Sequence, residues 1–297
     1  DVPVSIEGSF SVGLDVREWI TQGIVDVLVG TVQTFRGLAD YRPLVEASRG
    51  TDCRIHATVG STVDSDRLHD ATIEMMRAEV TNYWAQGVDG VYVSGWTDRW
   101  PLDASFYEII RELPHPGIMA PKDKYYYVPT VLGRFGIPDP GPGLVVQLPL
   151  DLAVNVPATV RFEISDDLPR WDKVGRVHEV LLRVRVENTT EIERLRFKLN
   201  GKELPGTSVR KINEIYRLVA PRYRVGSCYW FVFKLDRDHW PQRGHNTLEV
   251  TLLNRDPGVV PQISVRDVEV ETEYLLGRSF HRAFVDPDLG SYEGRRS

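Results

Sequence analysis

The sequence predicts an α/β domain followed by an all-β domain, and three observations support this prediction. Up to residue 121, apolar β-branched runs alternate with segments of helical period, at roughly 30-residue spacing. From residue 144 to residue 297, short strand-like runs follow one another without helices between them. The segment 122–143 is rich in Pro, Gly and Tyr, which predicts a connector between the two domains.

Four strand–helix units account for residues 1–121. Continuous β-branched runs are typical of strands that are buried on both faces. Asp15 is a plausible N-cap, and Gly23, Gly50 and Gly87 end helical segments. The predicted strands are 2–5, 25–32, 53–60 and 88–96, and the predicted helices are 15–24, 38–50, 66–87 and 103–115.

The second domain has the pattern of an antiparallel β-sandwich. Within 182–187, apolar residues alternate with charged ones, which is typical of a sheet with one face in water. Asn200-Gly201 is a strong hairpin turn signal. Short strands with frequent turns predict a sandwich, followed by an irregular C-terminal tail. The predicted strands are 158–165, 177–188, 195–204, 228–235, 246–255 and 263–275.

Strand–helix repeats of this kind form parallel sheets with right-handed crossovers. Two architectures fit: a doubly wound open sheet, or part of an eight-stranded barrel. No GxGxxG or GxxxxGK[ST] motif follows any predicted strand, which weakens the nucleotide-binding versions of the open sheet. A full barrel needs eight units, and four units are consistent with a missing N-terminal half. The start at Asp1 also favours a fragment or a processed chain.

Composition excludes several classes of function. The formal net charge is -6, and basic residues are spread along the chain, so no nucleic-acid partner is expected. No apolar run approaches the ~20 residues of a membrane span, and no membrane partner is expected. Cys53 and Cys228 fall in different predicted domains, which excludes a disulfide-stapled fold and a cysteine-rich zinc site. No cofactor or metal is predicted, and the compartment stays open.

Two segments resemble a known group of proteins. Residues 13–30, GLDVREWITQGIVDVLVG, and residues 83–96, YWAQGVDGVYVSGW, are similar to bacterial glycosyl-hydrolase-like (β/α)8-barrel proteins. The run 244–275, GHNTLEVTLLNRDP…ISVRDVEVETEYL, is similar to their accessory β-sandwich. This resemblance implies the C-terminal half of a TIM-type barrel, with strands five to eight, and a carbohydrate ligand. The missing N-terminal half or a second copy of the chain would then be a partner.

Barrel enzymes place their sites at the carboxyl ends of the strands, and this rule selects two acids. Glu7 follows the first predicted strand and Asp98 follows the fourth. Glycoside hydrolysis needs two carboxylates at a fixed separation, so Glu7 and Asp98 are the candidate catalytic pair. The alternative is that both are solvated loop carboxylates. The strand 53–60 carries no carboxylate, which departs from the retaining barrel hydrolases.

Four further residues are candidates for binding substrate. Trp96 and Trp100 can stack on the C–H face of a sugar, and Arg99 can donate to its hydroxyls. His56 can contact substrate from its strand, although it can equally be a hydrogen-bonded core histidine. Trp96 and Trp100 can instead pack at the barrel rim or the domain interface.

Two functions therefore compete. The first is that this chain is part of a glycoside hydrolase that acts on a carbohydrate. In that case the isolated chain is expected to be inactive. The alternative is a non-catalytic carbohydrate-binding or structural protein on a degenerate barrel. The sandwich can bind carbohydrate, or it can have the purely structural role of holding the first domain in place. The cluster Asp166, Asp167 and Asp172 can be a calcium site or a polar turn, and Asp26 and Asp89 are predicted to be structural.

Overall fold

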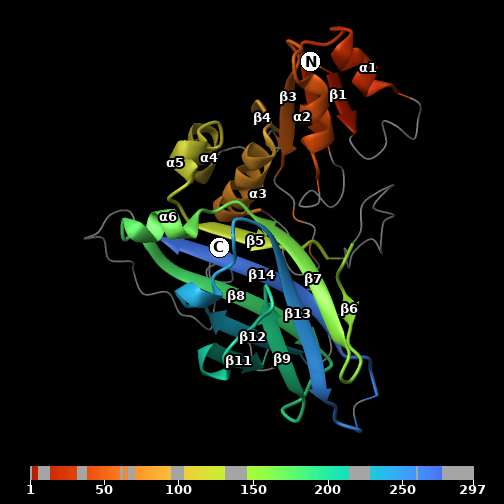
Figure 1. The fold of residues 1–297 in the computed structure, drawn as a ribbon, viewed down its shortest axis with the longest axis vertical. Helices are drawn as coiled ribbons and strands as arrows, with labels where there is room; N and C mark the ends of the chain where they lie inside the picture. The colour runs from red at the N-terminus through yellow and green to blue at the C-terminus, as the bar shows by residue number, and fades with distance from the viewer. Residues whose placement is uncertain are drawn as a thin grey trace. The chain divides into compact units, whose positions relative to one another are not determined.

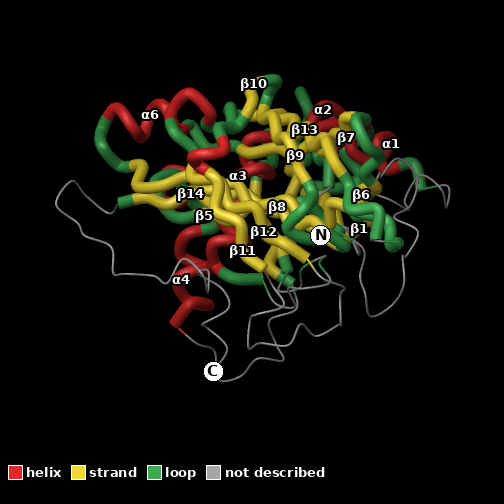
Figure 2. Tube along the Cα trace, turned by 90° about the horizontal axis from the view of Figure 1, so that it is seen from below, coloured by secondary structure: helices red, strands yellow, loops and turns green. Residues whose placement is uncertain are grey.

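The structure is a computed structural model, and it describes residues 2–5, 14–31, 39–60, 63, 65, 71–94, 104–130, 146–213, 228–258 and 260–275. Among these residues the chain is mostly β, with strands β1 to β14 and six α-helices (Figures 1 and 2). It divides into two compact units. The parallel-sheet unit holds residues 1–120, 126–149 and 163–165, and the sandwich unit holds residues 121–125, 150–162 and 166–297.

The parallel-sheet unit is built on four strands in the order β1-β2-β3-β4. Each neighbouring pair is parallel, with Val29 opposite His56 and His56 opposite Gly90. The strands are β1 (Val2–Ser5), β2 (Val27–Thr31), β3 (Arg54–Val59) and β4 (Gly90–Val93). The helices are α1 (Val16–Thr21), α2 (Arg42–Ser48), α3 (Ile73–Gln86), α4 (Ala104–Glu112) and α5 (Pro116–Met119).

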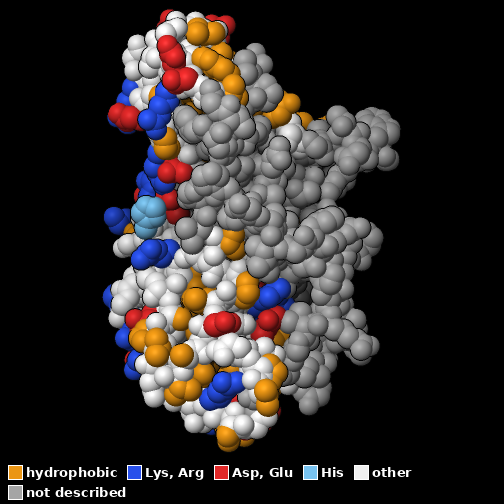
Figure 3. Space-filling model, turned by 90° about the vertical axis from the view of Figure 1, so that its right-hand side faces the viewer, with side chains coloured by type: hydrophobic (Ala, Val, Ile, Leu, Met, Phe, Trp, Pro, Cys, Tyr) orange, Lys and Arg blue, Asp and Glu red, His pale blue; other side chains and the backbone are white. Residues whose placement is uncertain are grey.

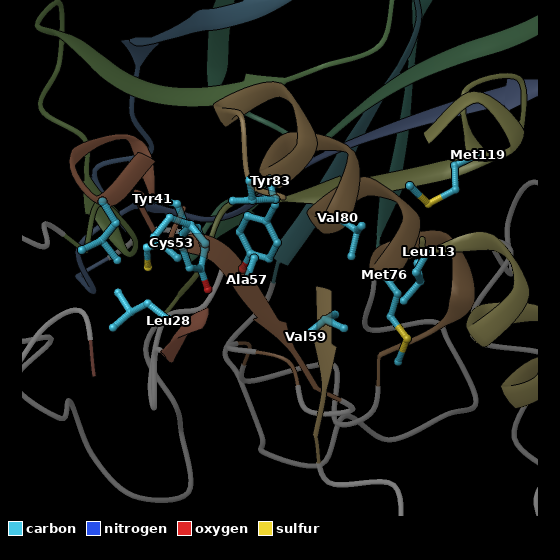
Figure 4. Close-up of a cluster of buried hydrophobic side chains, with 14 of the residues drawn as sticks. Leu28, Tyr41, Cys53, Ala57, Val59, Met76, Val80, Tyr83, Leu113 and Met119 are labelled. Atoms are coloured by element: carbon cyan, nitrogen blue, oxygen red, sulfur yellow. The ribbon is translucent and has the colours of Figure 1, made fainter. Parts of the chain in front are cut away.

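The core of this unit lies between one face of the sheet and the helices (Figure 4). Ile55, Ala57 and Val59 alternate along β3 and are all fully buried in this cluster. The helices contribute buried side chains such as Val80 of α3 and Ile109 of α4. Each large apolar side chain buried here contributes about 1.5–3 kcal/mol, so the period-2 pattern of β3 decides which face the helices cover.

The helix ends follow from local hydrogen bonds. The carboxylate of Asp15 accepts from the backbone N–H of Glu18 at 2.9 Å, which confirms its prediction as an N-cap. Thr72 caps α3 in the same way, through the N–H of Met75. Gly87 ends α3 in the left-handed conformation, with φ of 95°, which a side chain would disfavour.

The prediction of a TIM-barrel half is wrong. The four parallel strands form an open sheet, with β1 and β4 as its outermost strands. Barrel closure requires that strand number, tilt and shear agree, and strand–helix repeats report only the parallel pairing. The predicted strand positions agree with β1 to β4, but their assignment as barrel strands five to eight does not follow.

The sandwich unit contains two further open sheets. One has the order β10-β9-β13-β7, and the other has the order β11-β12-β8-β14-β5, with β6 also paired to β14. The pairs β9–β10, β9–β13, β11–β12, β8–β12, β8–β14 and β6–β14 are antiparallel. The elements are β5 (Lys124–Tyr127), β6 (Leu150–Asp151), β7 (Pro157–Ile164), α6 (Leu168–Lys173), β8 (Val177–Glu187), β9 (Arg194–Leu199), β10 (Lys202–Glu203), β11 (Val209–Asn213), β12 (Cys228–Lys234), β13 (Gly244–Asn254) and β14 (Ser264–Tyr274).

Aromatic side chains join the two sheets of this unit. The ring of Phe197 on β9 lies 5.1 Å from the rings of both Phe231 and Phe233 on β12. Asn200 and Gly201 both have positive φ, and they turn the chain from β9 to β10, which confirms the predicted hairpin. Alternating apolar residues of both sheets thus form a sandwich-like core.

The charged face of the six-stranded sheet differs from the prediction of a face in water. Arg185 is only 1% exposed, and its guanidinium pairs with Asp267 on the neighbouring strand. Arg183 and Glu271 form a second pair at 2.9 Å. The Tyr125 hydroxyl donates to Glu269. Because each charge has a partner, these groups can be buried without the full cost of desolvation.

Candidate functional site

The carboxyl ends of β1 to β4 lie at one edge of the sheet, because all four strands are parallel. In open α/β sheets, ligands bind outside this edge. The predicted site residues Glu7, Trp96, Asp98, Arg99 and Trp100 lie outside the described residues, so their roles stay predictions. His56 is the predicted site residue that the structure describes.

His56 lies on the face of the sheet that is opposite the helical core. Ile55, Ala57 and Val59 point to the core, so His56 and Thr58 point the other way. Val91 and Val93 of β4 pack against the same core, which puts Tyr92 beside Thr58, its partner in the register. We call His56, Thr58, Tyr92 and Val29 the His56 face.

The imidazole of His56 lies directly over Gly90. A Cβ atom built on Gly90 would be 2.6 Å from Nε2 and 2.7 Å from Cδ2 of His56. Burial lowers the pKa of His56; the Asp89 carboxylate opposes this shift and Arg54 adds to it. The ring is therefore neutral at neutral pH, with one nitrogen that donates and one that accepts.

Thr58 brings a buried hydroxyl to the same face. The residue is 6% exposed, and its Oγ1 has no hydrogen-bond partner in the described part of the structure. Its backbone N–H donates to the hydroxyl of Tyr41 at 3.1 Å. A buried hydroxyl without a partner costs about 1–3 kcal/mol, so a function is a reasonable explanation for its presence.

Tyr92 completes the face with an aromatic ring. It is 50% exposed, whereas Val29, on the same face of the sheet but on β2, is 3% exposed. An exposed aromatic ring beside polar groups is the arrangement that stacks on an apolar ligand surface. Sequence reasoning missed Tyr92: alternation puts it on the same face of β4 as Gly90, and only the register of β4 with β3, in which Gly90 stands opposite His56, puts it on the His56 face.

Asp89 has a structural role, as predicted. Its carboxylate accepts from the backbone N–H of Ile55 at 2.9 Å, and its own N–H donates to the carbonyl of Ile55 at 2.8 Å. It thereby fixes the start of β4 against β3. The aspartate also stands close enough to influence the charge of His56.

Within the described ranges, no cluster of three or more His, Cys, Asp or Glu side chains could hold a metal ion. The three aspartates considered for calcium are engaged elsewhere: Asp166 pairs with Lys124 at 2.9 Å, Asp167 caps α6, and Asp172 pairs with Arg237 at 2.8 Å. Cys53 and Cys228 are buried free thiols.

No helix in the described part of the chain has the length and apolar character that crossing a membrane requires. Large apolar side chains are exposed in both units, for example Tyr92 and Val260. Figure 3 shows one face on which apolar, acidic and basic side chains are interspersed. The described residues on this face therefore present no continuous block of one charge.

Comparisons with known proteins do not assign this chain to a family. No protein-family model matches the chain, and no curated protein matches it. A solved structure of a Paenibacillus sp. cycloisomaltooligosaccharide glucanotransferase, complexed with cycloisomaltoheptaose, is 12% identical, with a TM-score of 0.21. The match covers 84% of this chain and 36% of that chain, so this chain spans about a third of its length. That TM-score assigns neither a fold nor an activity to this chain.

Proposed function

We propose that this chain binds a saccharide on the His56 face, near the carboxyl edge of the parallel sheet, and does not cleave it. The observation that carries the proposal is the buried hydroxyl of Thr58, which has no partner among the described residues and stands beside a neutral imidazole. The exposed ring of Tyr92 lies on the same face.

The chemistry of these groups suits a ligand that is rich in hydroxyls. A sugar offers donors and acceptors at its rim and an apolar C–H surface across its ring. Neutral His56 can donate to one hydroxyl and accept from another, and Thr58 can do the same through Oγ1. The half-exposed Tyr92 can stack on the C–H surface. Trp96, Arg99 and Trp100 follow β4 in sequence, and we include them in the proposed site as further sugar contacts.

The strand order favours binding over hydrolysis. Glu7 follows β1 and Asp98 follows β4, and these are the outermost strands of the sheet. Three spacings of about 4.8 Å separate such strands, or about 14 Å in total. A pair of catalytic carboxylates needs a separation of about 5–9.5 Å. The two strands that these acids follow are therefore farther apart than the carboxyl groups of such a pair.

The test compares two threonine variants. Thr58→Val removes the buried hydroxyl at constant shape, so we expect a more stable protein, by about 1 kcal/mol, that binds saccharide at least tenfold more weakly. Thr251→Val on β13 is the matched control, because Thr251 is 2% exposed and its Oγ1 also has no described partner. We expect Thr251→Val to gain the same stability with unchanged affinity.

The affinities are measured by calorimetry on neutral hexasaccharides of glucose, xylose and mannose, and stabilities by denaturant unfolding. Equal affinities of Thr58→Val and the wild-type chain would contradict the proposal, as would an absence of binding to every probe. The same oligosaccharides, incubated with the chain and analysed for products, test the alternative. Cleavage that is lost in Glu7→Gln or Asp98→Asn would show a hydrolase instead.

A further inference from the structure

The hydroxyl of Tyr41 lies between two strands of the parallel sheet. It donates to the carbonyl of Gly30 on β2 at 3.0 Å and accepts from the N–H of Thr58 on β3 at 3.1 Å. Tyr41 is 0% exposed. A side-chain hydroxyl therefore joins the backbones of the two strands close to their carboxyl ends.

This hydroxyl occupies the place of a hydrogen bond of the ladder. The N–H of Arg54 donates directly to the carbonyl of Asp26 at 2.9 Å, at the start of the same pair of strands. Ladder bonds between parallel strands recur every two residues. With Gly30 opposite Ala57 in the register, the regular donor to the carbonyl of Gly30 would be the N–H of Thr58.

The insertion widens the gap between β2 and β3 at this edge. A direct N–H···O bond spans about 2.9 Å, whereas here two bonds of 3.0 and 3.1 Å with an oxygen between them connect the same two backbone groups. The widened gap occurs at Thr58, the residue whose hydroxyl carries the proposed function. On the side of β2, the backbone N–H of Thr58 is thus held through Tyr41 and not by a direct bond to that strand.

Tyr41 is itself fixed from two sides. Its backbone N–H donates to Oε1 of Gln86 at 2.7 Å, and Nε2 of Gln86 donates to the carbonyl of Ala39 at 3.3 Å. Its ring packs edge-on against Tyr83, with ring centres 4.9 Å apart, and Figure 4 shows the two rings together in the core. Both contacts come from α3, so this helix holds the hydroxyl in place.

We propose that Tyr41 is a positioning residue that holds β2 and β3 apart and thereby presents the hydroxyl of Thr58 to the saccharide. The inference rests on the proposed function for its ligand, but the strand geometry can be tested without one. Removal of the hydroxyl lets the N–H of Thr58 donate directly to the carbonyl of Gly30. The backbone then moves, and Oγ1 of Thr58 moves with it.

The test is Tyr41→Phe, with Tyr83→Phe as the matched control. Tyr83→Phe removes a hydroxyl from the same core, one that donates to Glu79 at 2.5 Å. We expect Tyr41→Phe to shift the amide resonance of Thr58 in NMR spectra and to weaken binding of the neutral hexasaccharides about tenfold. Tyr83→Phe should leave that resonance and the affinity unchanged.

A double-mutant cycle separates positioning from a general loss of structure. If Tyr41 acts through Thr58, the change Tyr41→Phe should cause no further loss of affinity when Thr58→Val is already present. The proposal would be overturned if Tyr41→Phe caused the same loss of affinity in the Thr58→Val protein as in the wild-type protein. Affinity losses of the same size in Tyr83→Phe would also overturn it, because they would show a general effect of the core.

Two further readouts keep the test decisive. If the wild-type chain binds none of the saccharides, the proposed function fails, and an unchanged Thr58 amide resonance in Tyr41→Phe then decides against the positioning role. If Tyr41→Phe does not fold, the wild-type chain is measured instead. Its buried Tyr41 hydroxyl proton should exchange slowly and show a nuclear Overhauser effect to the Thr58 amide proton, and absence of that effect would overturn the proposal.

Discussion

Replacement of Gly90 by alanine tests the packing of the His56 face most directly. The new Cβ would lie 2.6 Å from Nε2, 2.7 Å from Cδ2 and 3.0 Å from Cε1 of His56. Three contacts at or below 3.0 Å cannot all be relieved by a small shift, so the imidazole has to leave its position or β4 has to move. Overpacking of this kind costs about 1–3 kcal/mol. We expect Gly90→Ala to lower the free energy of unfolding by that amount.

The assay is denaturant unfolding followed by circular dichroism, with two comparisons. Gly117→Ala is the control, because nothing lies within 4 Å of its Cβ position in α5, and alanine in a helix is neutral or stabilising by up to about 1 kcal/mol. The double variant Gly90→Ala with His56→Ala removes the ring that causes the clash. It should recover most of the loss, so that the two changes are not additive.

Two results would refute this reasoning. The first is a Gly90→Ala protein as stable as the wild type, which would mean that the imidazole moves away at no cost. The second is additivity between Gly90→Ala and His56→Ala, which would mean that the new methyl group clashes with something other than His56. In either case the ring position on which the proposed site depends would be wrong.

Two further predictions concern charge. Because the folded-state pKa of His56 lies below its ordinary value of 6.5, its contribution to stability is complete above about pH 6.5 and is lost as the pH falls toward the folded pKa. The stability difference between wild type and His56→Gln should therefore shrink from about pH 8 to about pH 5; urea unfolding at each pH measures it, and a constant difference would contradict the effect of burial on His56. Arg77→Met should cost about 3–5 kcal/mol in the same assay, since it leaves the fully buried carboxylate of Glu112 without the guanidinium at 2.8 Å. Arg49→Met, at an exposed pair, should cost less than about 1 kcal/mol, and an equal cost for both arginines would contradict the role of burial.

The strands could be predicted from local pattern, but the closure of the sheet could not. Runs such as residues 54–59 carry the β-branched pattern of a buried strand, and the structure has β3 there. Closure depends on tilt and shear over all strands, which no local pattern records. β5 lies inside the segment that composition predicts to be a connector, because an edge strand is defined by its partner β14. α5 begins at Pro116, where a helix end was predicted, since proline also favours the first turn of a helix.

The candidate site could be predicted only in part. His56 follows from strand alternation and from the rule that sites lie toward the carboxyl ends of parallel strands. Tyr41 could not be found, because its hydroxyl contacts residues 11 and 17 positions away in sequence, and no local pattern marks a side chain inside a backbone ladder. The burial of Arg185 was not predicted, because alternation of charged and apolar residues usually indicates a sheet with one solvent-exposed face.

The paired charges between β8 and β14 also have a consequence for folding fidelity. In the native alignment Arg185 stands opposite Asp267. A slip by two residues keeps the apolar face inward, and hydrophobicity alone would not reject it. The slip that places Asp267 opposite Glu187 would also bring Glu269 opposite Arg185 and Glu271 opposite Arg183, so it keeps two opposite-charge pairs. The slip in the other direction would place Glu271 opposite Glu179 and Glu269 opposite Leu181, so it keeps only the pair of Asp267 with Arg183. Like charges opposite each other repel, so the charged row discriminates against this second slip, which the apolar core would accept.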